Sequence, residues 1–404
     1  GRDKNFVAAE DAHGNVYIVS YGNGLFIYNP KEDELQHFSA ADKDPLFHSD
    51  FLLNIFIDRS GCIWICTGDG VYCCRELKDL YTEHVKIEPN TNREWSNYVR
   101  HISNIGNDKL AVSTRANRTY IYDTRTQQRT LERQTDACVY DYAIDPQGKK
   151  WISTKGDGIY IDNVRYSKYK KEHYAPGAAF YKTIFDKQGR AWIATWGEGL
   201  LITPQTMGQQ PRKFEQFLNA DGKEAQIHDL LLDRKGRLWV CSNNGILMVN
   251  TAEKKITAQK FLRFSDENGK LPVSEINCGI EAHDGKLWFA ATGGVLKCSY
   301  DEKTRELEYE LFDTSKGLTD NNTRSLEEDN YGNIWIGTEE GISRLNAKTN
   351  DIRSFQTGRT IFSNNFTENC ATKLNDGRLV FGVSDGMIFI QPSRTISMPP
   401  AKMK

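Results

Sequence analysis

The chain has 404 residues, of which 39% are apolar and 11% aromatic, so it can bury a large core. Its 52 lysine and arginine residues nearly balance 54 aspartate and glutamate residues, and the net charge is −2. This balance argues against an electrostatic nucleic-acid binder, and the most basic stretch, residues 165–171, is expected to be a solvated outer hairpin. We find no signal peptide, and no apolar run approaches the roughly 20 residues of a membrane-spanning helix.

Similar units follow one another along the chain. The first is predicted to have strands at residues 6–10, 15–19, 25–28 and 35–38, with polar turns between them. The second repeats this order around Trp64, whereas the third, residues 110–123, is degenerate. The remaining units are predicted at residues 145–160 and 186–201, from residues 233, 283 and 329, and at 374–390.

The clearest unit covers residues 329–345, DNYGNIWIGTEEGISRL. It consists of a polar turn with Gly332, a short apolar run centred on Trp335, a second turn and the start of another strand. The Trp335 position recurs at intervals of 40 to 49 residues, occupied by Tyr17, Trp64, Ala111, Trp151, Trp192, Trp239, Trp288, Trp335 and Val380. Nine copies at this spacing are typical of four-stranded propeller blades.

These repeats predict an all-β propeller built of about nine four-stranded blades, covering residues 1–392. A single blade leaves two apolar faces uncovered, so blades are expected to pack side by side with the recurring rings as wedges between them. The last copy lacks an obvious fourth strand, and a segment from elsewhere, such as the chain start or the tail near Thr395, is expected to supply it. Residues 393–404 are interpreted as a linker to a following domain.

Nine cysteines without CxxC spacing argue against a zinc or redox motif. Cys66, Cys73, Cys241 and Cys298 fall within predicted strands, where a free cysteine acts as a small buried hydrophobe. An odd, unpatterned set of this kind indicates mostly reduced thiols, which alone favours a cytosolic protein.

A family resemblance follows from two motifs. The links Trp95-Ser96-Asn97 and Phe362-Ser363-Asn364, and more loosely 317–321, precede first strands, and D-x-x-G-x-I-W-I-G-T-x-x-G-I follows in the eighth copy. Together they resemble the two-component-regulator propeller repeat, and the resemblance covers about residues 6–392. It implies the periplasmic sensor region of a Bacteroidetes hybrid two-component system, which binds an oligosaccharide and signals to a histidine kinase. The abrupt start at Gly1 and the exit at 399–400 fit a piece of such a longer protein.

The resemblance leaves two arrangements open. All nine copies could join one ring, which covers every apolar face, or a seven-bladed ring usual for the family could follow two blades of a preceding propeller. We expect no cofactor, no metal and no membrane contact for this segment, with a homodimer through the full-length protein as one option for assembly.

Ligand-binding residues are expected on one face of the propeller, which we call the link face. There, the turns after the recurring ring-bearing strands meet the links that lead into each first strand. Expected ligand-binding residues on this face are Trp196, Tyr21, Arg115, Lys155, Asn97, Tyr181, His228, Arg324 and Asn365. Trp196 lies in a glycine-flanked turn, so we expect either stacking on a sugar ring or packing on a neighbouring loop. Trp95, an apolar anchor of its link, is expected to have a structural role.

Basic residues predicted on this face suggest an acidic sugar as one ligand. Charge-assisted hydrogen bonds to such a sugar could come from Arg115, Arg118, Lys155, Lys182 and Arg324.

Two other classes of function compete with a sensor. A polysaccharide lyase or glycosidase needs converging carboxylates or a Tyr/His pair with a metal, and scattered candidates are Asp69, Glu198, Glu339, His48 and His228. No hydrolase, phosphate-loop or calcium-loop motif connects them, so we expect no catalytic residue in this segment. A protein-interaction scaffold at the cell surface, as in a secretion apparatus, remains the other alternative.

Overall fold

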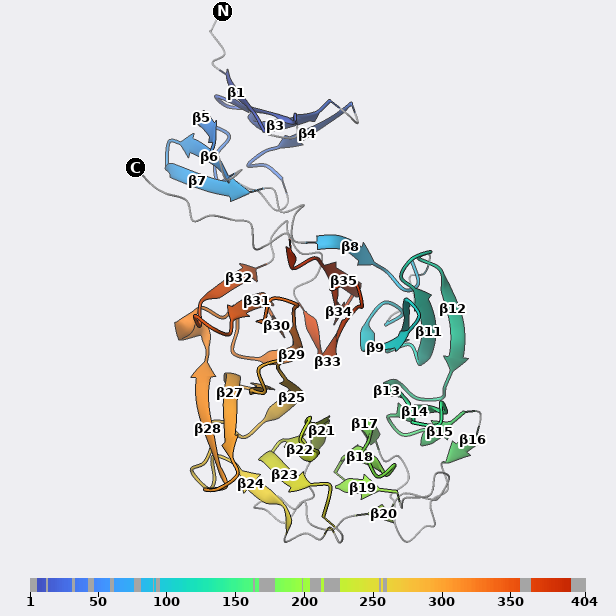
Figure 1. Ribbon diagram of the computed structural model, residues 1–404. Coiled ribbons are helices and arrows are strands. Elements are labelled where there is room, and N and C mark those ends of the chain that lie inside the picture. The colour runs from blue at the N-terminus through green and yellow to red at the C-terminus, as the bar shows by residue number, and fades with distance from the viewer. Residues whose placement is uncertain are drawn as a thin grey trace, which may run out of the picture. The chain divides into compact units, whose positions relative to one another are not determined.

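The structure is a computed structural model that describes residues 6–11, 14–30, 33–42, 47–58, 62–75, 81–89, 91, 95–162, 164–166, 179–197, 199–203, 212–213, 226–253, 256, 260–356 and 365–393. The described part is all-β, apart from the short 3₁₀ segment η3 (Thr314–Lys316) (Figure 1). None of its helical segments is long and apolar enough to cross a membrane. The chain forms two compact units: a first unit, Gly1–Thr82 with Ser393–Lys404, and a ring unit, Glu83–Pro392.

The first unit contains two antiparallel sheets. One has the order β1 (Phe6–Glu10), β2 (Val16–Ser20), β3 (Gly24–Asn29) and β4 (Glu34–Phe38), and the other the order β5 (Leu52–Ile57), β6 (Cys62–Thr67) and β7 (Gly70–Arg75). Tyr17, Val19, Ile55 and Ile65 belong to the apolar core of this unit. The predicted first two repeats therefore exist, although the second has three strands among the described residues.

One face of the second sheet remains open within the described first unit. Phe56 pairs with Trp64 and Trp64 with Cys73, so their side chains share that face. Phe56 is exposed, Cys73 is exposed and Trp64 is only half-buried. The expectations of a buried Cys73 and a fully wedged Trp64 are therefore wrong here, because the described residues of this unit provide no sheet to cover that face.

The described residues of the ring unit form seven four-stranded antiparallel sheets. Six of them consist of four strands that follow one another in the chain. The first three are formed by β9 (Val99–Gly106), β10 (Lys109–Thr114), β11 (Arg118–Asp123) and β12 (Arg129–Gln134); by β13 (Val139–Ile144), β14 (Lys150–Thr154), β15 (Ile159–Ile161) and β16 (Val164–Tyr166); and by β17 (Ala179–Phe185), β18 (Ala191–Trp196), β19 (Leu200–Ile202) and β20 (Arg212–Lys213). The next three are formed by β21 (Ile227–Leu232), β22 (Arg237–Ser242), β23 (Gly245–Asn250) and β24 (Leu262–Phe264); by β25 (Ile276–Glu281), β26 (Leu287–Ala291), β27 (Gly294–Asp301) and β28 (Glu306–Phe312); and by β29 (Thr323–Glu328), β30 (Asn333–Thr338), β31 (Gly341–Asn346) and β32 (Ile352–Gln356).

The seventh sheet closes the ring. It has the order β33 (Phe366–Lys373), β34 (Leu379–Val383), β35 (Gly386–Ile390) and β8 (Tyr81–Val85), so its fourth strand precedes the first blade in sequence. The first strands contact one another in turn, and β33 contacts β9 (Figure 1). Val85 belongs to the same buried cluster as Met387 and Phe389. The arrangement of seven ring blades and two further blades is therefore the one present among the described residues. A segment from elsewhere completes the last blade, as expected, but it is β8 and not the chain start, and the tail near Thr395 lies outside the described residues.

The recurring rings are the wedges that the repeat pattern predicted. Trp151, Trp192, Trp239, Trp288 and Trp335 are each at most 1% exposed. Among the described residues, five tryptophans donate their indole N–H to an aspartate six residues earlier, at distances of 2.7–2.9 Å: Trp64 to Asp58, Trp151 to Asp145, Trp192 to Asp186, Trp239 to Asp233 and Trp335 to Asp329. The D-x-x-G-x-x-W pattern thus ties the turn to the wedge.

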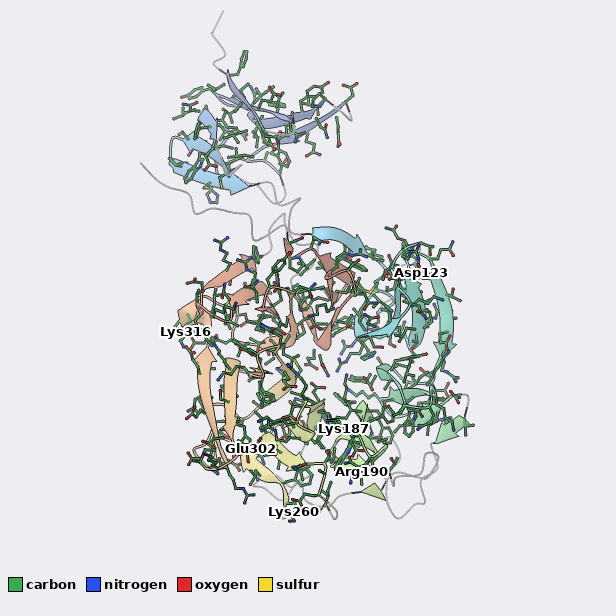
Figure 2. All side chains as sticks on the ribbon, in the orientation of Figure 1. Asp123, Lys187, Arg190, Lys260, Glu302 and Lys316 are labelled. Atoms are coloured by element: carbon green, nitrogen blue, oxygen red, sulfur yellow. The ribbon has the colours of Figure 1, made fainter. Side chains whose placement is uncertain are left out.

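The degenerate third copy keeps the fold by two substitutions. Ala111 is fully buried and belongs to one apolar cluster with Tyr142 and Ile152 of the next blade. The turn at residues 115–118 has no glycine. There, Asn117 adopts φ 63°, the left-handed conformation that asparagine tolerates better than most residues. Charged side chains such as Asp123, Lys260 and Lys316 lie toward the outer edge of the ring in Figure 2.

Candidate functional site

Turns and links meet on one face of the ring unit, which is the link face expected from the repeats. The backbone N–H of Lys155 donates to the Cys138 carbonyl at 2.9 Å, and that of Ser384 donates to the Asn365 carbonyl at 3.1 Å. Each bond joins a turn after a second strand to a link before a first strand. The segments that vary most between repeats therefore come together at this face.

Four aromatic side chains form a row on the link face. Trp196, 39% exposed, stacks on Tyr181 with ring centroids 5.2 Å apart and on His228 at the same separation. The ring centroid of Tyr181 in turn lies 4.4 Å from that of Tyr140. Three expected binding residues, Trp196, Tyr181 and His228, are thus brought into one stack that we call the Trp196 row, with Tyr140 as its fourth member.

The row follows from equivalent positions in three blades. Val139, Phe180 and Ile227 each pair with the end of the neighbouring second strand, and the next residue in each case is Tyr140, Tyr181 or His228. Sequence reasoning named two of these three and missed Tyr140. Aligning the residue after the apolar anchor of every first strand would have found it.

Burial favours neutral rings within the row. It raises the pKa of the Tyr181 hydroxyl above its ordinary value, and it lowers the pKa of His228. The Nδ1 atom of His228 lies 3.1 Å from the Ile276 carbonyl, where it donates a hydrogen bond. The row therefore offers a largely uncharged aromatic surface with one partly exposed indole.

Arg100 supports the row from the first blade. Its guanidinium lies 4.0 Å from the Tyr140 ring centroid and 5.7 Å from that of Tyr181, and it donates to the Glu368 carbonyl at 2.8 Å. A cation over an aromatic face is attractive when it is desolvated, so Arg100 fixes the two tyrosines. This residue was also not anticipated from the sequence.

Buried polar groups lie one position further along the first strands. Lys182 forms an ion pair with Asp141 at 3.3 Å, and Asn369 donates to Asp229 at 2.7 Å across the ring. Burial alone would lower the pKa of Lys182, but the charges of Asp141 and Asp229 raise it above its ordinary value. These groups are occupied by one another.

A pocket of about 460 Å³ lies next to the first and last blades. Its lining consists of Lys86, Thr91, Trp95, Ser96, Asn97, Tyr98, Asn365, Ser384 and Asp385. Two expected binding residues, Asn97 and Asn365, therefore meet here, but both side chains have protein partners. Asn97 accepts from the Glu88 backbone N–H at 2.8 Å, and Asn365 accepts from Arg324 at 3.0 Å.

Trp95 and Tyr98 form a second aromatic group at the rim of this pocket. Trp95 is 47% exposed, which corrects the expectation that it serves as a packed anchor. Its φ of 67° turns the chain at that point. The Arg115 guanidinium lies 5.0 Å from the Trp95 ring centroid and 4.4 Å from that of Tyr98.

The five basic residues that suggested an acidic sugar fall into two groups. Three are occupied by carboxylates: Arg118 by Glu88 at 2.9 Å, Lys182 by Asp141 at 3.3 Å, and Arg324 by Glu339. Arg115 and Lys155 are exposed, and neither forms an ion pair among the described residues. A grip by all five residues is therefore not available in this structure.

Other candidates are not brought together. Tyr21, which stacks edge-on against Phe51, lies in the first unit, as do Asp69 and His48. Glu198 lies outside the described residues, and Glu339 pairs with Arg324. No three His, Cys, Asp or Glu side chains of the described part are grouped as metal ligands.

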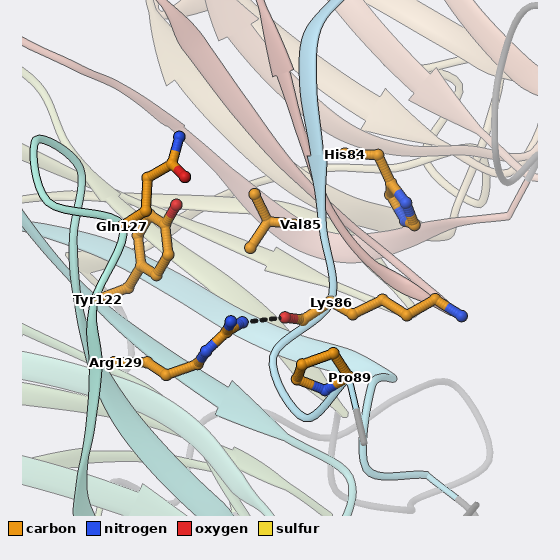
Figure 3. Close-up of a pocket in the computed structure, with 7 residues that line it drawn as sticks. All are labelled: His84, Val85, Lys86, Pro89, Tyr122, Gln127 and Arg129. Carbon is orange, nitrogen blue, oxygen red and sulfur yellow. Dashed lines mark hydrogen bonds between the residues drawn. The ribbon is translucent and has the colours of Figure 1, made fainter. Parts of the chain in front are cut away.

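A second pocket of about 380 Å³ lies at the seam where the ring closes. Figure 3 shows Val85 and Lys86 opposite Tyr122 and Arg129, whose guanidinium donates to the Lys86 carbonyl. The pocket therefore separates the closing strand β8 from the outer hairpin of the first blade. Only Lys86 also lines the pocket of about 460 Å³ on the link face, which we call the link-face pocket.

Comparison with protein families identifies residues 317–340 as a two component regulator propeller repeat. A histidine kinase of Formosa agariphila, named Histidine kinase P4, is 22% identical over 172 residues, which cover 42% of this chain and 12% of the kinase. The chain thus spans a small part of this curated relative.

Solved structures share the fold at low sequence identity. The extracellular domain of a putative one component system from B. thetaiotaomicron superposes with a TM-score of 0.59 and 18% identity, covering 98% of this chain and 53% of that one. A streptogramin B lyase superposes with a TM-score of 0.58 and 15% identity, covering 78% of this chain and 99% of that one. PorZ, a surface component of the type-IX secretion system of Porphyromonas gingivalis, superposes with a TM-score of 0.54 and 16% identity, covering 96% of this chain and 61% of that one.

Proposed function

We propose that this chain, which carries two-component-regulator propeller repeats, is the ligand-binding part of an extracytoplasmic sensor whose ligand is an oligosaccharide. In the full-length protein, binding would be relayed to a histidine kinase. The repeat match at residues 317–340 and the similarity to a histidine kinase support the signalling role. The extracellular solved domain of the same fold supports an extracytoplasmic location.

The Trp196 row is the observation that carries the choice of ligand. An indole that is 39% exposed, yet flanked by the nearly parallel rings of Tyr181 and His228, offers a fixed apolar edge. The C–H face of a pyranose packs on such a surface, and its hydroxyls find hydrogen-bonding groups alongside. Because the row is already stacked, little side-chain entropy is lost when a sugar binds.

The link-face pocket supports a polar ligand at the same face. It is lined mainly by hydroxyl, amide and charged side chains, with Trp95 and Tyr98 as its aromatic members. Small ligands are held by this combination of an aromatic surface and a few polar groups. We propose that the segment itself is not an enzyme, since the catalytic candidates from the sequence do not converge in the described residues.

Binding to a glycan array, followed by calorimetry on the best glycans, tests the proposal. Wild-type protein should bind one class of oligosaccharide, and Trp196→Ala should weaken that binding about tenfold or more. Tyr331→Ala is a matched control, because Tyr331 is an exposed aromatic residue in a turn between a first and a second strand. No glycan bound by the wild type, or cleaved glycan after incubation, would contradict the proposal.

A cell-surface scaffold is the second candidate, favoured by the fold shared with PorZ. A scaffold needs a protein partner and no sugar. Its signature would be stoichiometric binding of one identified protein, unaffected by Trp196→Ala, from a chain that binds no glycan.

A further inference from the structure

Two exposed cations on the link face lack a carboxylate partner. Arg115 and Lys155 each follow a second strand, and neither pairs with an acidic side chain among the described residues. The other basic candidates of this face are paired, so these two stand apart. An exposed cation is ordinary by itself, but the surroundings of these two are not.

The first further observation is that the two cations flank one residue. The Lys155 backbone N–H donates to the Cys138 carbonyl at 2.9 Å, and the Cys138 thiol donates to the carbonyl of Thr114, which directly precedes Arg115, at 3.7 Å. Burial raises the pKa of the Cys138 thiol, while the positive charges of Arg100, Arg115 and Lys155 act to lower it. Three positive charges therefore converge on this point of the face.

The second observation is that aromatic rings hold both cations. Arg115 lies over Trp95 and Tyr98, and the Lys155 ammonium lies 5.8 Å from the Tyr140 ring centroid. Such contacts restrict a long side chain without satisfying its N–H donors. The donors stay available for an acceptor that arrives from solvent.

The third observation connects the cations to the Trp196 row. Tyr140 is the member of the row nearest to Lys155, and the row continues through Tyr181 to Trp196. Lys155 also pairs with Ala179 in a β-bridge, which leads directly into the strand that carries Tyr181. Cations and aromatic surface are thus parts of one continuous stretch across three blades.

We propose that the ligand is an acidic oligosaccharide, with a carboxylate or sulfate bound by Arg115 and Lys155 while a further sugar ring of the same ligand packs against the exposed edge of Trp196. This inference rests on the proposed function and adds the charge of the ligand to it. Charge-assisted hydrogen bonds to an anion are roughly twice as strong as neutral ones, and guanidinium groups match planar anions well. Selectivity for acidic glycans then comes from two residues that pair with no acidic side chain in the described part of the chain.

The test compares uronate-bearing, sulfated and neutral glycans on one array and by calorimetry at low and high salt. Acidic glycans should bind about tenfold tighter than neutral glycans of equal length, and only their binding should weaken as salt rises. Preference for uronates over sulfated glycans, or the reverse, identifies the acidic group. A bound set that is entirely neutral would overturn the inference but leave the proposed function in place.

Variants separate the charge from the stacking. The double variant Arg115→Gln/Lys155→Gln should lose about tenfold or more in affinity for acidic glycans and less than twofold for neutral ones. Trp196→Ala should weaken both classes. The control Arg125→Gln/Lys187→Gln removes the same charge from turns away from the link face and should change neither.

The outcomes test the inference and the proposed function separately. Unchanged affinity for acidic glycans in the Arg115→Gln/Lys155→Gln variant would refute the inference. Failure of every glycan to bind the wild type would refute the proposed function and, with it, the inference. Thermal melting of each variant shows whether the exposed substitutions have left the fold intact.

Discussion

The indole nitrogen of Trp288 has no hydrogen-bond acceptor among the described residues, because Ala282 stands six residues before it, where the other tryptophan copies have aspartate. Trp288 is nevertheless fully buried. A buried donor without a partner costs about 1–3 kcal/mol. This blade therefore keeps its wedge while lacking the contact that ties the turn to it.

Ala282→Asp should stabilise the ring unit by about 1 kcal/mol, because the carboxylate can accept from Trp288 and from the backbone of its own turn, as Asp329 does. Chemical denaturation measures the change in the free energy of unfolding. In a Trp288→Phe background the gain should fall, since the indole donor is missing. An equal gain in both backgrounds would show that the indole is not involved.

Trp335→Ala should mainly reduce stability, whereas Trp196→Ala should mainly reduce glycan affinity. Trp335 is fully buried, so its truncation should cost about 3–5 kcal/mol in unfolding free energy. Trp196 is 39% exposed, and its loss should cost about 1 kcal/mol while removing most glycan affinity. Denaturation and calorimetry on the same two variants check both halves, and a large stability loss for Trp196→Ala would assign it a structural role.

Val85→Asp should open the ring at its seam. Val85 is buried with Met387 and Phe389, and an aspartate there places a charge in an apolar contact, which should cost about 3 kcal/mol or more. Hydrogen exchange should show faster exchange of the β35 amides than of those in β22. Val71→Asp, at an exposed valine on β7, should change stability by less than about 0.5 kcal/mol.

His101 should make the ring less stable in mild acid. Burial lowers its pKa from 6.5 to about 4, and its Nε2 accepts from the Tyr142 backbone N–H. The unfolded chain therefore binds a proton before the folded chain does, so stability is lost as pH falls from about 6.5 to about 4.

The loss attributable to His101 should be of the order of 2–3 kcal/mol across that range. Unfolding free energies at several pH values measure it. His101→Gln should flatten this part of the curve, whereas His37→Gln, at an exposed histidine, should leave its slope unchanged. An unaltered slope in His101→Gln would assign the acid sensitivity to other groups.

The repeat pattern predicted the blades because each Trp, its aspartate and the turn glycine act within a few residues of one another. The closing strand β8 was not predicted, since residues 81–85, YTEHV, carry no blade motif and acquire their role only by pairing with β35. The site was foreseen in part for the same reason. Trp196 could be recognised from its own turn, but the pairing of Arg324 with Glu339 depends on where two separate segments meet.

The position of β8 also decides how the ring responds to tension on its ends. The polypeptide enters the ring along β8 and leaves it after β35, and these two strands are neighbours in a single sheet. A pull on the chain at both ends of the ring therefore loads the hydrogen bonds between these two strands first. Tension carried by the backbone therefore enters the ring through the seventh blade.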